Sequence, residues 1–280
     1  MVRKDLPDPV KEQEDTNPTQ TGNIMAQIPS LQEMLEAGVH FGHQTRRWNP
    51  RMKPYILTSR NGIYVINLEK TLEALQRAVE KILRVRSTGA SVLFVGTKAT
   101  IQGAVRDEAT RSGQPYVTTR WLGGMLTNYQ TIRKSIKHLE DIERMENDGV
   151  LTDLTKKEAS DLMEEKGRLQ DVFGGIRNLR NLPGLVFIAD AKTEQIAIAE
   201  AKRLNIPTVA IVDTNTDPTL VDYPIPANDD AIKSVRLIAA TIANAVMSGG
   251  QPQAAPVLPV AVAAVAAPVA VAPAVAEVVA

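Results

Sequence analysis

Short, uninterrupted apolar runs alternate with amphipathic segments through the middle of the chain, and this alternation limits the possible folds more than any other feature. The runs are GIYVINL (62–68), SVLFVGT (91–97), LVFIADA (185–191) and TVAIVDT (208–214). Each of the first three precedes a segment with helical spacing of its apolar residues. Strands that are apolar at successive positions are typical of parallel sheets, because helices cover both faces of such sheets. The pattern predicts an α/β fold with a doubly wound, mainly parallel sheet flanked by helices.

Residues 129–182 do not fit a strand–helix unit. They contain two long charged segments, separated by NDG (147–149), in which apolar residues recur three and four positions apart. The expected seam consists of Ile132, Ile136, Leu139, Ile142 and Met145 on the first segment, and Leu162, Leu169 and Val172 on the second. This spacing predicts an antiparallel helical hairpin, a coiled coil, that is inserted between strands and projects from the sheet.

The composition changes near both ends of the chain. Residues 1–24 are polar and contain no apolar run of the kind a secretory signal needs, so we expect a disordered extension or a start site assigned upstream of Met25. Residues 249–280 are almost wholly Ala, Val, Pro and Gln, and their recurring prolines favour a low-complexity linker over a membrane-spanning helix. Between these ends we expect one α/β domain over residues 25–248, with the hairpin inserted at about 129–182.

A Rossmann-like enzyme that handles nucleotides or sugars is the main alternative for such a fold. The chain lacks the Gly-x-Gly-x-x-Gly fingerprint, and VGTKAT (95–100) lacks the spacing of a P-loop, so a plain turn is expected there. If that turn were functional, the helix N-terminus after it could hold one phosphate. The chain has three histidines, no cysteine and no Gly-x-Ser-x-Gly elbow, which leaves no recognisable catalytic triad. Asp190 and Asp213 follow strands, where chemistry often occurs in this fold, but aspartate also commonly caps the next turn. We therefore expect no enzymatic activity, no small-molecule substrate and no required cofactor.

One stretch, GVHFGHQTRRWNPRMKPYI (38–56), combines cations with aromatic rings and contains no acidic residue. Cations neutralise phosphates, whereas aromatic rings and guanidinium planes stack on unpaired bases, a combination typical of RNA-binding proteins. Its two prolines predict an extended segment. TTRWLGGMLTN (118–128) repeats the Arg-Trp pair. The candidate RNA- or protein-contact residues are Arg46, Arg47, Trp48, Arg51, Lys53, Arg60, Arg120 and Trp121. The alternative is a solvated loop in which Trp48 and Phe41 cover the domain edge.

Several long motifs resemble those of the bacterial ribosomal protein S-two family, the second protein of the small ribosomal subunit. They are GVHFGHQTRRWNPRMKPYI, NLEKT, LFVGTK, RWLGGMLTN, LPGLVFIADAKTEQIAIAEAKRLNIPTVAIVDTNTDP and IPANDDAIKSVRLI. The resemblance runs in unbroken order from about Met25 to Met247. It implies an α/β domain with a protruding hairpin that is a structural constituent of the small subunit, bound to its rRNA near the head–body junction.

The resemblance also implies partners. They are small-subunit rRNA and other small-subunit proteins, including the first and largest one, which captures mRNA and which this family helps to recruit. It implies a place on a cytoplasmic ribosome, with an organellar ribosome as the alternative, and no contact with a membrane. The family pattern does not cover the 24-residue extension or the Ala/Val/Pro tail.

Cations on the predicted hairpin are further candidates for contact with rRNA phosphates. They are Arg133, Lys134, Lys137 and Lys156, and a solvated coiled-coil surface is the alternative. The formal net charge of the chain is zero. Because Lys and Arg supply most of the affinity for backbone phosphates, we expect weak, salt-sensitive binding to naked rRNA and assembly that depends on protein neighbours.

A possible metal site involves His43, Asp213 and Asp230. Asp213 ends a strand, Asp230 begins the next helix, and His43 precedes the sheet, so all three are expected near the crevice where open α/β sheets bind ligands. One imidazole and two carboxylates could bind zinc or a similar divalent ion and leave a fourth position for water or a partner protein. Near the basic stretch such an ion would act as a structural clip at a protein interface. The alternative is that the aspartates cap turns and His43 donates a hydrogen bond to one of them.

Overall fold

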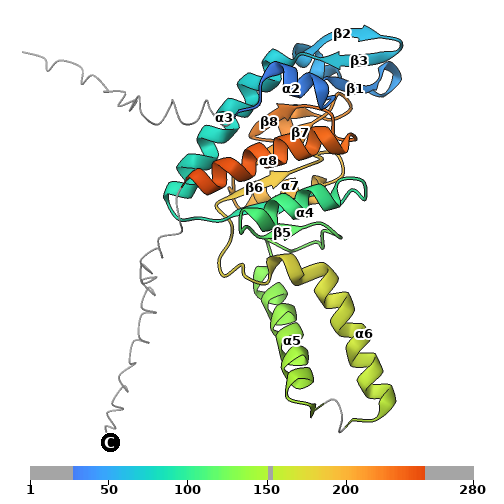
Figure 1. The fold of residues 1–280 in the computed structure, drawn as a ribbon, viewed down its shortest axis with the longest axis vertical. Helices are drawn as coiled ribbons and strands as arrows, with labels where there is room; N and C mark the ends of the chain where they lie inside the picture. The colour runs from blue at the N-terminus through green and yellow to red at the C-terminus, as the bar shows by residue number, and fades with distance from the viewer. Residues whose placement is uncertain (1–27, 151–153, 250–280) are drawn as a thin grey trace, which may run out of the picture.

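The larger sheet of the protein is parallel throughout and has the strand order β5-β4-β6-β7-β8 (Figure 1). It is seen in a computed structural model that describes residues 28–150 and 154–249. The strands are β4 (Val92–Val95), β5 (Tyr116–Val117), β6 (Leu185–Ile188), β7 (Thr208–Val212) and β8 (Tyr223–Pro226). Three of the predicted apolar runs form the adjacent strands β4, β6 and β7. The predicted doubly wound α/β fold is therefore confirmed.

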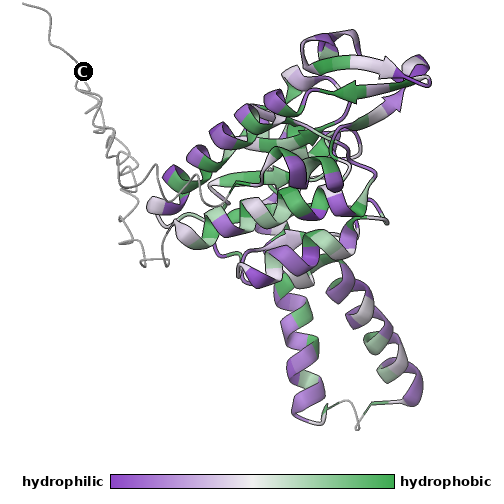
Figure 2. Cartoon of the chain, turned by 45° about the horizontal axis from the view of Figure 1, so that its top comes forward, coloured by the Kyte–Doolittle hydropathy of each residue, from purple (hydrophilic) through white to green (hydrophobic). Residues whose placement is uncertain are grey.

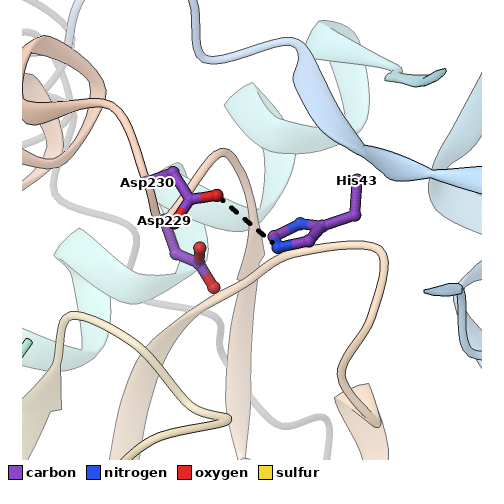
Figure 3. A group of neighbouring side chains, drawn as sticks. All are labelled: His43, Asp229 and Asp230. Carbon is purple, nitrogen blue, oxygen red and sulfur yellow. Dashed lines mark ion pairs between the residues drawn. The ribbon is translucent and has the colours of Figure 1, made fainter.

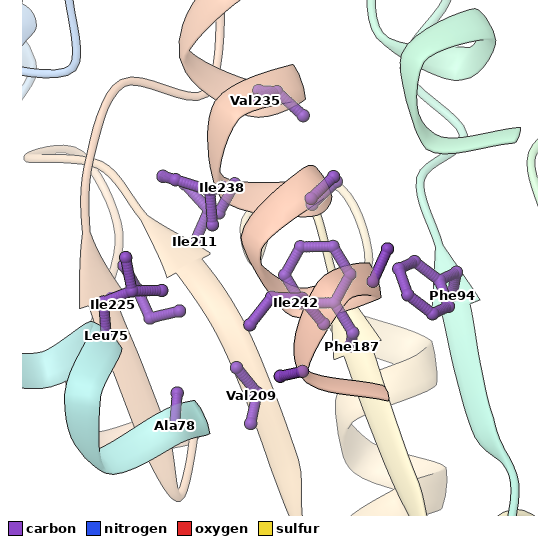
Figure 4. Close-up of a cluster of buried hydrophobic side chains, with 14 of the residues drawn as sticks. Leu75, Ala78, Phe94, Phe187, Val209, Ile211, Ile225, Val235, Ile238 and Ile242 are labelled. Atoms are coloured by element: carbon purple, nitrogen blue, oxygen red, sulfur yellow. The ribbon is translucent and has the colours of Figure 1, made fainter. Parts of the chain in front are cut away.

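Helices cover both faces of this sheet, which explains why its strands are apolar at successive positions. One face packs against α3 (Leu68–Ser87), α4 (Gln102–Arg111) and α8 (Ile232–Ser248), and the other against α7 (Gln195–Arg203). In β6, Leu185 and Phe187 point to the first face, whereas Val186 and Ile188 point to the second. Figure 4 shows the first core, where Phe187 and Phe94 lie beneath α8. Two complete cores thus hold the sheet in place.

A small antiparallel sheet with the order β1-β3-β2 lies beside the larger one (Figure 1). This lobe contains α2 (Leu31–Glu36), β1 (Phe41–Gln44), η1 (Thr45–Arg47), η2 (Pro50–Tyr55), β2 (Ile56–Arg60) and β3 (Ile63–Ile66). GIYVINL does form a strand, but its predicted place in the parallel sheet is wrong. Asn61 and Gly62 have φ of 52° and 77°, the signature of a type I′ hairpin turn, which makes β3 antiparallel to β2.

The basic stretch between β1 and β2 is not extended, contrary to the prediction. It forms the two short 3-10 helices η1 and η2. Asn49 caps η2 by accepting a hydrogen bond from the Arg51 N–H at 2.9 Å, and Pro50 occupies the first helical position. Proline is well suited to that position, because its fixed φ is helical and the N–H it lacks would have no partner there.

Two long helices form a lobe that projects from the sheet domain (Figure 1). They are α5 (Tyr129–Asn147) and α6 (Lys156–Phe173), followed by η4 (Gly174–Ile176). The predicted seam residues Ile132, Ile136, Leu139 and Ile142 are buried. Figure 2 shows that most residues of both helices are hydrophilic. His138 and Glu165 form an ion pair between the helices at 3.2 Å. Coiled-coil packing of this lobe stays a prediction.

The expectations for residues 1–24 and for the Ala/Val/Pro tail lie outside the described residues, except at Gly249. In the part of the chain that the structure describes, none of the helices has the length and apolar character needed to cross a membrane.

Candidate functional site

A cluster of charged side chains lies at the carboxyl edge of the parallel sheet. Lys98 follows β4, Asp190 follows β6, Asp213 follows β7, and Asp229 and Asp230 follow β8. The strands are parallel and adjacent, so the residues that follow them meet at one edge. This topology gathers charges that are far apart in the sequence.

His43 completes the cluster from the small lobe (Figure 3). Its Nδ1 lies 3.1 Å from Oδ2 of Asp213, which is 1% exposed, and its Nε2 lies 3.5 Å from Oδ2 of Asp230. The backbone reaches this point because residue 42 is glycine: a Cβ there would lie 2.6 Å from Cγ2 of Thr214. The His43 N–H also donates to Oγ1 of Thr214 at 2.9 Å. The structure thus places the three predicted residues side by side, but Asp213 and Asp230 face opposite ring nitrogens of His43, so these three do not converge on one ion.

Asp229 is a member of the cluster that the sequence interpretation missed. Potential ligand atoms of His43, Asp229 and Asp230 all lie within 4.8 Å of one another. The signal that could have identified Asp229 is its position beside Asp230, at the end of the strand that follows Asp213. Asn228, and not Asp230, caps the turn into α8, because its Oδ1 accepts hydrogen bonds from the N–H groups of Asp230 and Ala231.

Lys98 supplies a positive charge at the centre of these carboxylates. Its Nζ lies 2.6 Å from Asp230 Oδ1, 3.0 Å from Asp229 Oδ1 and 3.4 Å from Asp190 Oδ2. Asp190 also accepts hydrogen bonds from Lys192 and Thr193, so it caps its turn as one of the two interpretations expected. Sequence reasoning gave Lys98 no role, because its partners follow other strands.

The pKa values in the cluster show how its charges interact. Burial, with the nearby carboxylates of Asp190 and Asp213, raises the pKa of Asp229 to about 7, although Lys98 opposes the shift. The hydrogen bond to Asp213 raises the pKa of His43 in spite of partial burial. The hydrogen bond from Lys98 lowers the pKa of Asp230. Protons, Lys98 and any bound cation therefore compete for the same carboxylates.

The candidate contact residues of the basic stretch differ in their surroundings. Arg46, Arg47, Lys53 and Arg60 are exposed. Arg51 is exposed as well, but it pairs with Asp217 and donates to Oγ1 of Thr219 at 3.0 Å, so it connects η2 to the loop after β7. The half-buried ring of Trp48 packs on Tyr64, with ring centroids 5.2 Å apart. This packing agrees with the alternative in which Trp48 covers the domain edge.

The second Arg-Trp pair separates into one exposed and one buried residue. Arg120 is exposed, whereas Trp121 is 8% exposed and packs in the second core. Its indole N–H donates to Glu200 at 3.1 Å. The buried ring is not available to stack on a base, so that part of the sequence interpretation is corrected. The indole fills the space between α7 and the base of the helical lobe.

The cations of the helical lobe are exposed, as a contact surface requires. Arg133, Lys134 and Lys137 of α5 alternate with the buried Ile132 and Ile136. Lys156 begins α6 and is also exposed. Their contact with phosphates stays a prediction.

Comparison with protein families identifies the chain. The model of the family described as Ribosomal protein S2 matches residues 34–249. The match includes both sheets, the helical lobe and every residue of the charged cluster. The chain belongs to the ribosomal protein S2 family and is a structural, non-enzymatic protein of the small ribosomal subunit.

Proposed function

We propose that this protein binds small-subunit rRNA through the exposed cations of its small lobe and of its helical lobe. The observation that carries the proposal is the group Arg46, Arg47, Lys53 and Arg60, which is exposed on and around two 3-10 helices. Exposed cations of this kind contact backbone phosphates, which fix the orientation of a protein on nucleic acid. Arg120 and the cations of α5 and α6 provide a second contact.

The proposed partners also include small-subunit proteins. The formal net charge of zero limits what phosphates alone can contribute to affinity, so protein neighbours complete the binding site. One of them is the first and largest small-subunit protein, which this chain helps to recruit. The ribosome concerned is cytoplasmic or organellar.

The experiment is sedimentation of a lysate from cells that express a tagged chain. The tag should travel with small subunits through a sucrose gradient and shift to the top when Arg46, Arg47 and Lys53 are all replaced by alanine. Crosslinking in the wild-type fraction should join the small lobe to rRNA. A wild-type chain that stays in the soluble fraction would contradict the proposal. Depletion of the chain should lower the amount of the first protein on purified small subunits, and an unchanged amount would remove recruitment from the proposal.

We also propose that the cluster at the sheet edge binds a divalent ion such as zinc. The supporting observation is the donor set, in which one imidazole and two carboxylates converge. The ion would join the small lobe to the parallel sheet, because His43 belongs to the former and Asp229 and Asp230 follow a strand of the latter. This role is structural, since the ion would hold two parts of the fold together.

A further inference from the structure

One buried carboxylate, Glu200 of α7, binds four residues of the loop that leads into the helical lobe. Its side chain is 8% exposed. Oε1 accepts hydrogen bonds from Trp121 Nε1 at 3.1 Å and from the Gly124 N–H at 2.8 Å. Oε2 accepts from the N–H groups of Leu126 and Thr127 and from Oγ1 of Thr127, each at 3.0 Å. All five donors thus come from seven consecutive residues, 121–127.

The loop has a shape that suits an anion. Gly124 has a φ of 93°, a conformation that side chains rarely adopt. The N–H groups of Gly124, Leu126 and Thr127 face Glu200, whereas the Met125 N–H donates to the Leu122 carbonyl. Backbone N–H groups that converge in this way form an anion-binding nest. Burial opposes ionisation of Glu200, but the hydrogen bonds from the loop outweigh burial and hold its pKa below the usual value. The nest therefore contains a charged carboxylate from the chain itself.

The loop also connects the sheet domain to the base of the helical lobe. It ends at Asn128, and α5 begins at the next residue. Two other polar contacts lie near the base of the lobe. The Tyr129 hydroxyl donates to the Leu179 carbonyl, which joins two parts of the lobe. The Thr119 hydroxyl donates to the Asp171 carbonyl, which joins the preceding loop to the lobe. Glu200 instead joins this region to a helix that packs on the parallel sheet.

We propose that Glu200 is a positioning residue that sets the direction of the α5–α6 lobe relative to the parallel sheet. The carboxylate holds Trp121 and the 124–127 backbone in one arrangement, so α5 leaves the sheet in one direction. This places Arg120, Arg133, Lys134 and Lys137 for contact with rRNA, a consequence that rests on the function proposed above.

The experiment measures the direction of the lobe directly. The chain has no cysteine, so Arg144→Cys and Lys233→Cys place one spin label on α5 and one on α8. Glu200→Gln and Glu200→Ala should broaden the distribution of distances between the labels. Glu194→Gln is the matched control, because Glu194 is also a buried carboxylate at α7 but accepts from the Thr97 N–H and not from the loop. An unchanged distribution in both Glu200 variants would overturn the proposal.

Two further measurements separate positioning from general damage. Labels at Arg106 and Lys233, both within the sheet domain, should keep their distance in every variant, and a change there would assign the effect to the core. Hydrogen exchange at Gly124, Leu126 and Thr127 in Glu200→Gln should accelerate about 10- to 100-fold, because hydrogen bonds to a charged group are among the strong ones. Normal exchange at these amides would contradict the proposal.

Chemical rescue tests the carboxylate itself. Acetate added to Glu200→Ala should enter the nest and narrow the distance distribution, whereas chloride at the same ionic strength should not. If acetate leaves the distance distribution broad, the effect comes from lost packing. If chloride narrows the distribution as much as acetate does, the effect comes from screening. Either result would reject the proposal. If the lobe loses its direction but small-subunit occupancy is normal, Glu200 keeps its positioning role, and the proposed rRNA contact of the lobe fails instead.

Discussion

The Nζ atom of Lys98 lies 2.6 Å from Oδ1 of Asp230, and the other carboxylate oxygen of Asp230 faces His43. Lys98 also lies 3.0 Å from the buried Asp229. The ammonium group thus neutralises carboxylates that would otherwise repel one another. The same position makes Lys98 a competitor for any cation that His43, Asp229 and Asp230 bind.

Replacing Lys98 by methionine should therefore destabilise the metal-free protein. Removing one partner of a buried ion pair costs about 3 kcal/mol, and here the buried carboxyl groups of Asp190 and Asp229 lose the charge that compensates them. Urea denaturation in the presence of EDTA measures the change in the free energy of unfolding. Lys233→Met, which removes an exposed lysine from α8, is the control. Equal effects of the two substitutions would show that Lys98 does not neutralise the cluster.

Zinc binding should respond in opposite directions to two substitutions. His43→Ala removes a ligand and should reduce bound zinc to background. Lys98→Met removes the competing charge and should lower the zinc dissociation constant about tenfold, which is the effect of one nearby charge at a partly screened site. Metal analysis after dialysis and calorimetric titration measure these effects. Zinc retained equally by wild type and His43→Ala would leave His43 as a hydrogen-bonding residue only.

Removing Arg46, Arg47 and Lys53 together should weaken binding to rRNA while the domain stays folded. Arg51 is left in place, because its pairing with Asp217 contributes to the fold. Binding of wild type to naked rRNA should be weak and fall steeply with salt, and each lost phosphate contact should reduce the slope against log salt by about 0.7 to 0.9. Filter binding at several salt concentrations measures the slope.

The control for this triple variant is removal of Arg77 and Arg84, two exposed cations of α3. A slope that falls equally in the control would show that general charge, and not the basic stretch, governs binding. Tight binding of wild type to naked rRNA at high salt would contradict the expected dependence on protein neighbours.

Phe187 is the residue at which the first core should be most sensitive. It is fully buried under α8, and its ring meets that of Phe94 edge-on, with centroids 5.3 Å apart (Figure 4). Phe187→Ala should lower the free energy of unfolding by about 3 to 5 kcal/mol, because it leaves a cavity between sheet and helix. Phe187→Leu keeps most of the volume and should cost about 1 kcal/mol. Chemical denaturation of both variants gives the values, and a small loss for Phe187→Ala would mean that the core collapses around the site.

Acid should weaken the contact between Glu200 and its loop. The folded-state pKa of Glu200 is lowered, so its stabilising contribution is present above the unfolded value of about 4.3 and disappears as the pH falls through the folded value. The free energy of unfolding should thus decrease more steeply below about pH 4.3 in wild type than in Glu200→Gln. Urea denaturation at a series of pH values tests this, and parallel curves would show that Glu200 does not contribute to acid sensitivity.

The sequence by itself determined the fold class and the main elements. The spacing of apolar residues predicts strands β4, β6 and β7, the helices that follow β4 and β6, and the helical lobe, because the period of apolar residues is a local property of a segment. The approach of Asp213 and Asp230 was predictable as well, since residues that follow adjacent parallel strands meet at one edge. His43 reaches that edge from β1 of the small sheet. β8 was not predicted, because its sequence, YPIP, contains two prolines. Proline is tolerated in a strand where its missing N–H is not needed for pairing, and β8 lies at the edge of the sheet.

Only the tertiary structure decided which segments became partners. β3 has the apolar run of a central strand, yet a two-residue turn pairs it with β2 in the separate sheet. Lys98 lies 131 residues before Asp229, and Glu200 lies 79 residues after Trp121, so no local spacing connects either pair. Burial makes these contacts specific, because a carboxylate or an indole N–H removed from water must find a partner inside the fold. The chain alone shows that such groups need partners, but the packing of sheet and helices selects them.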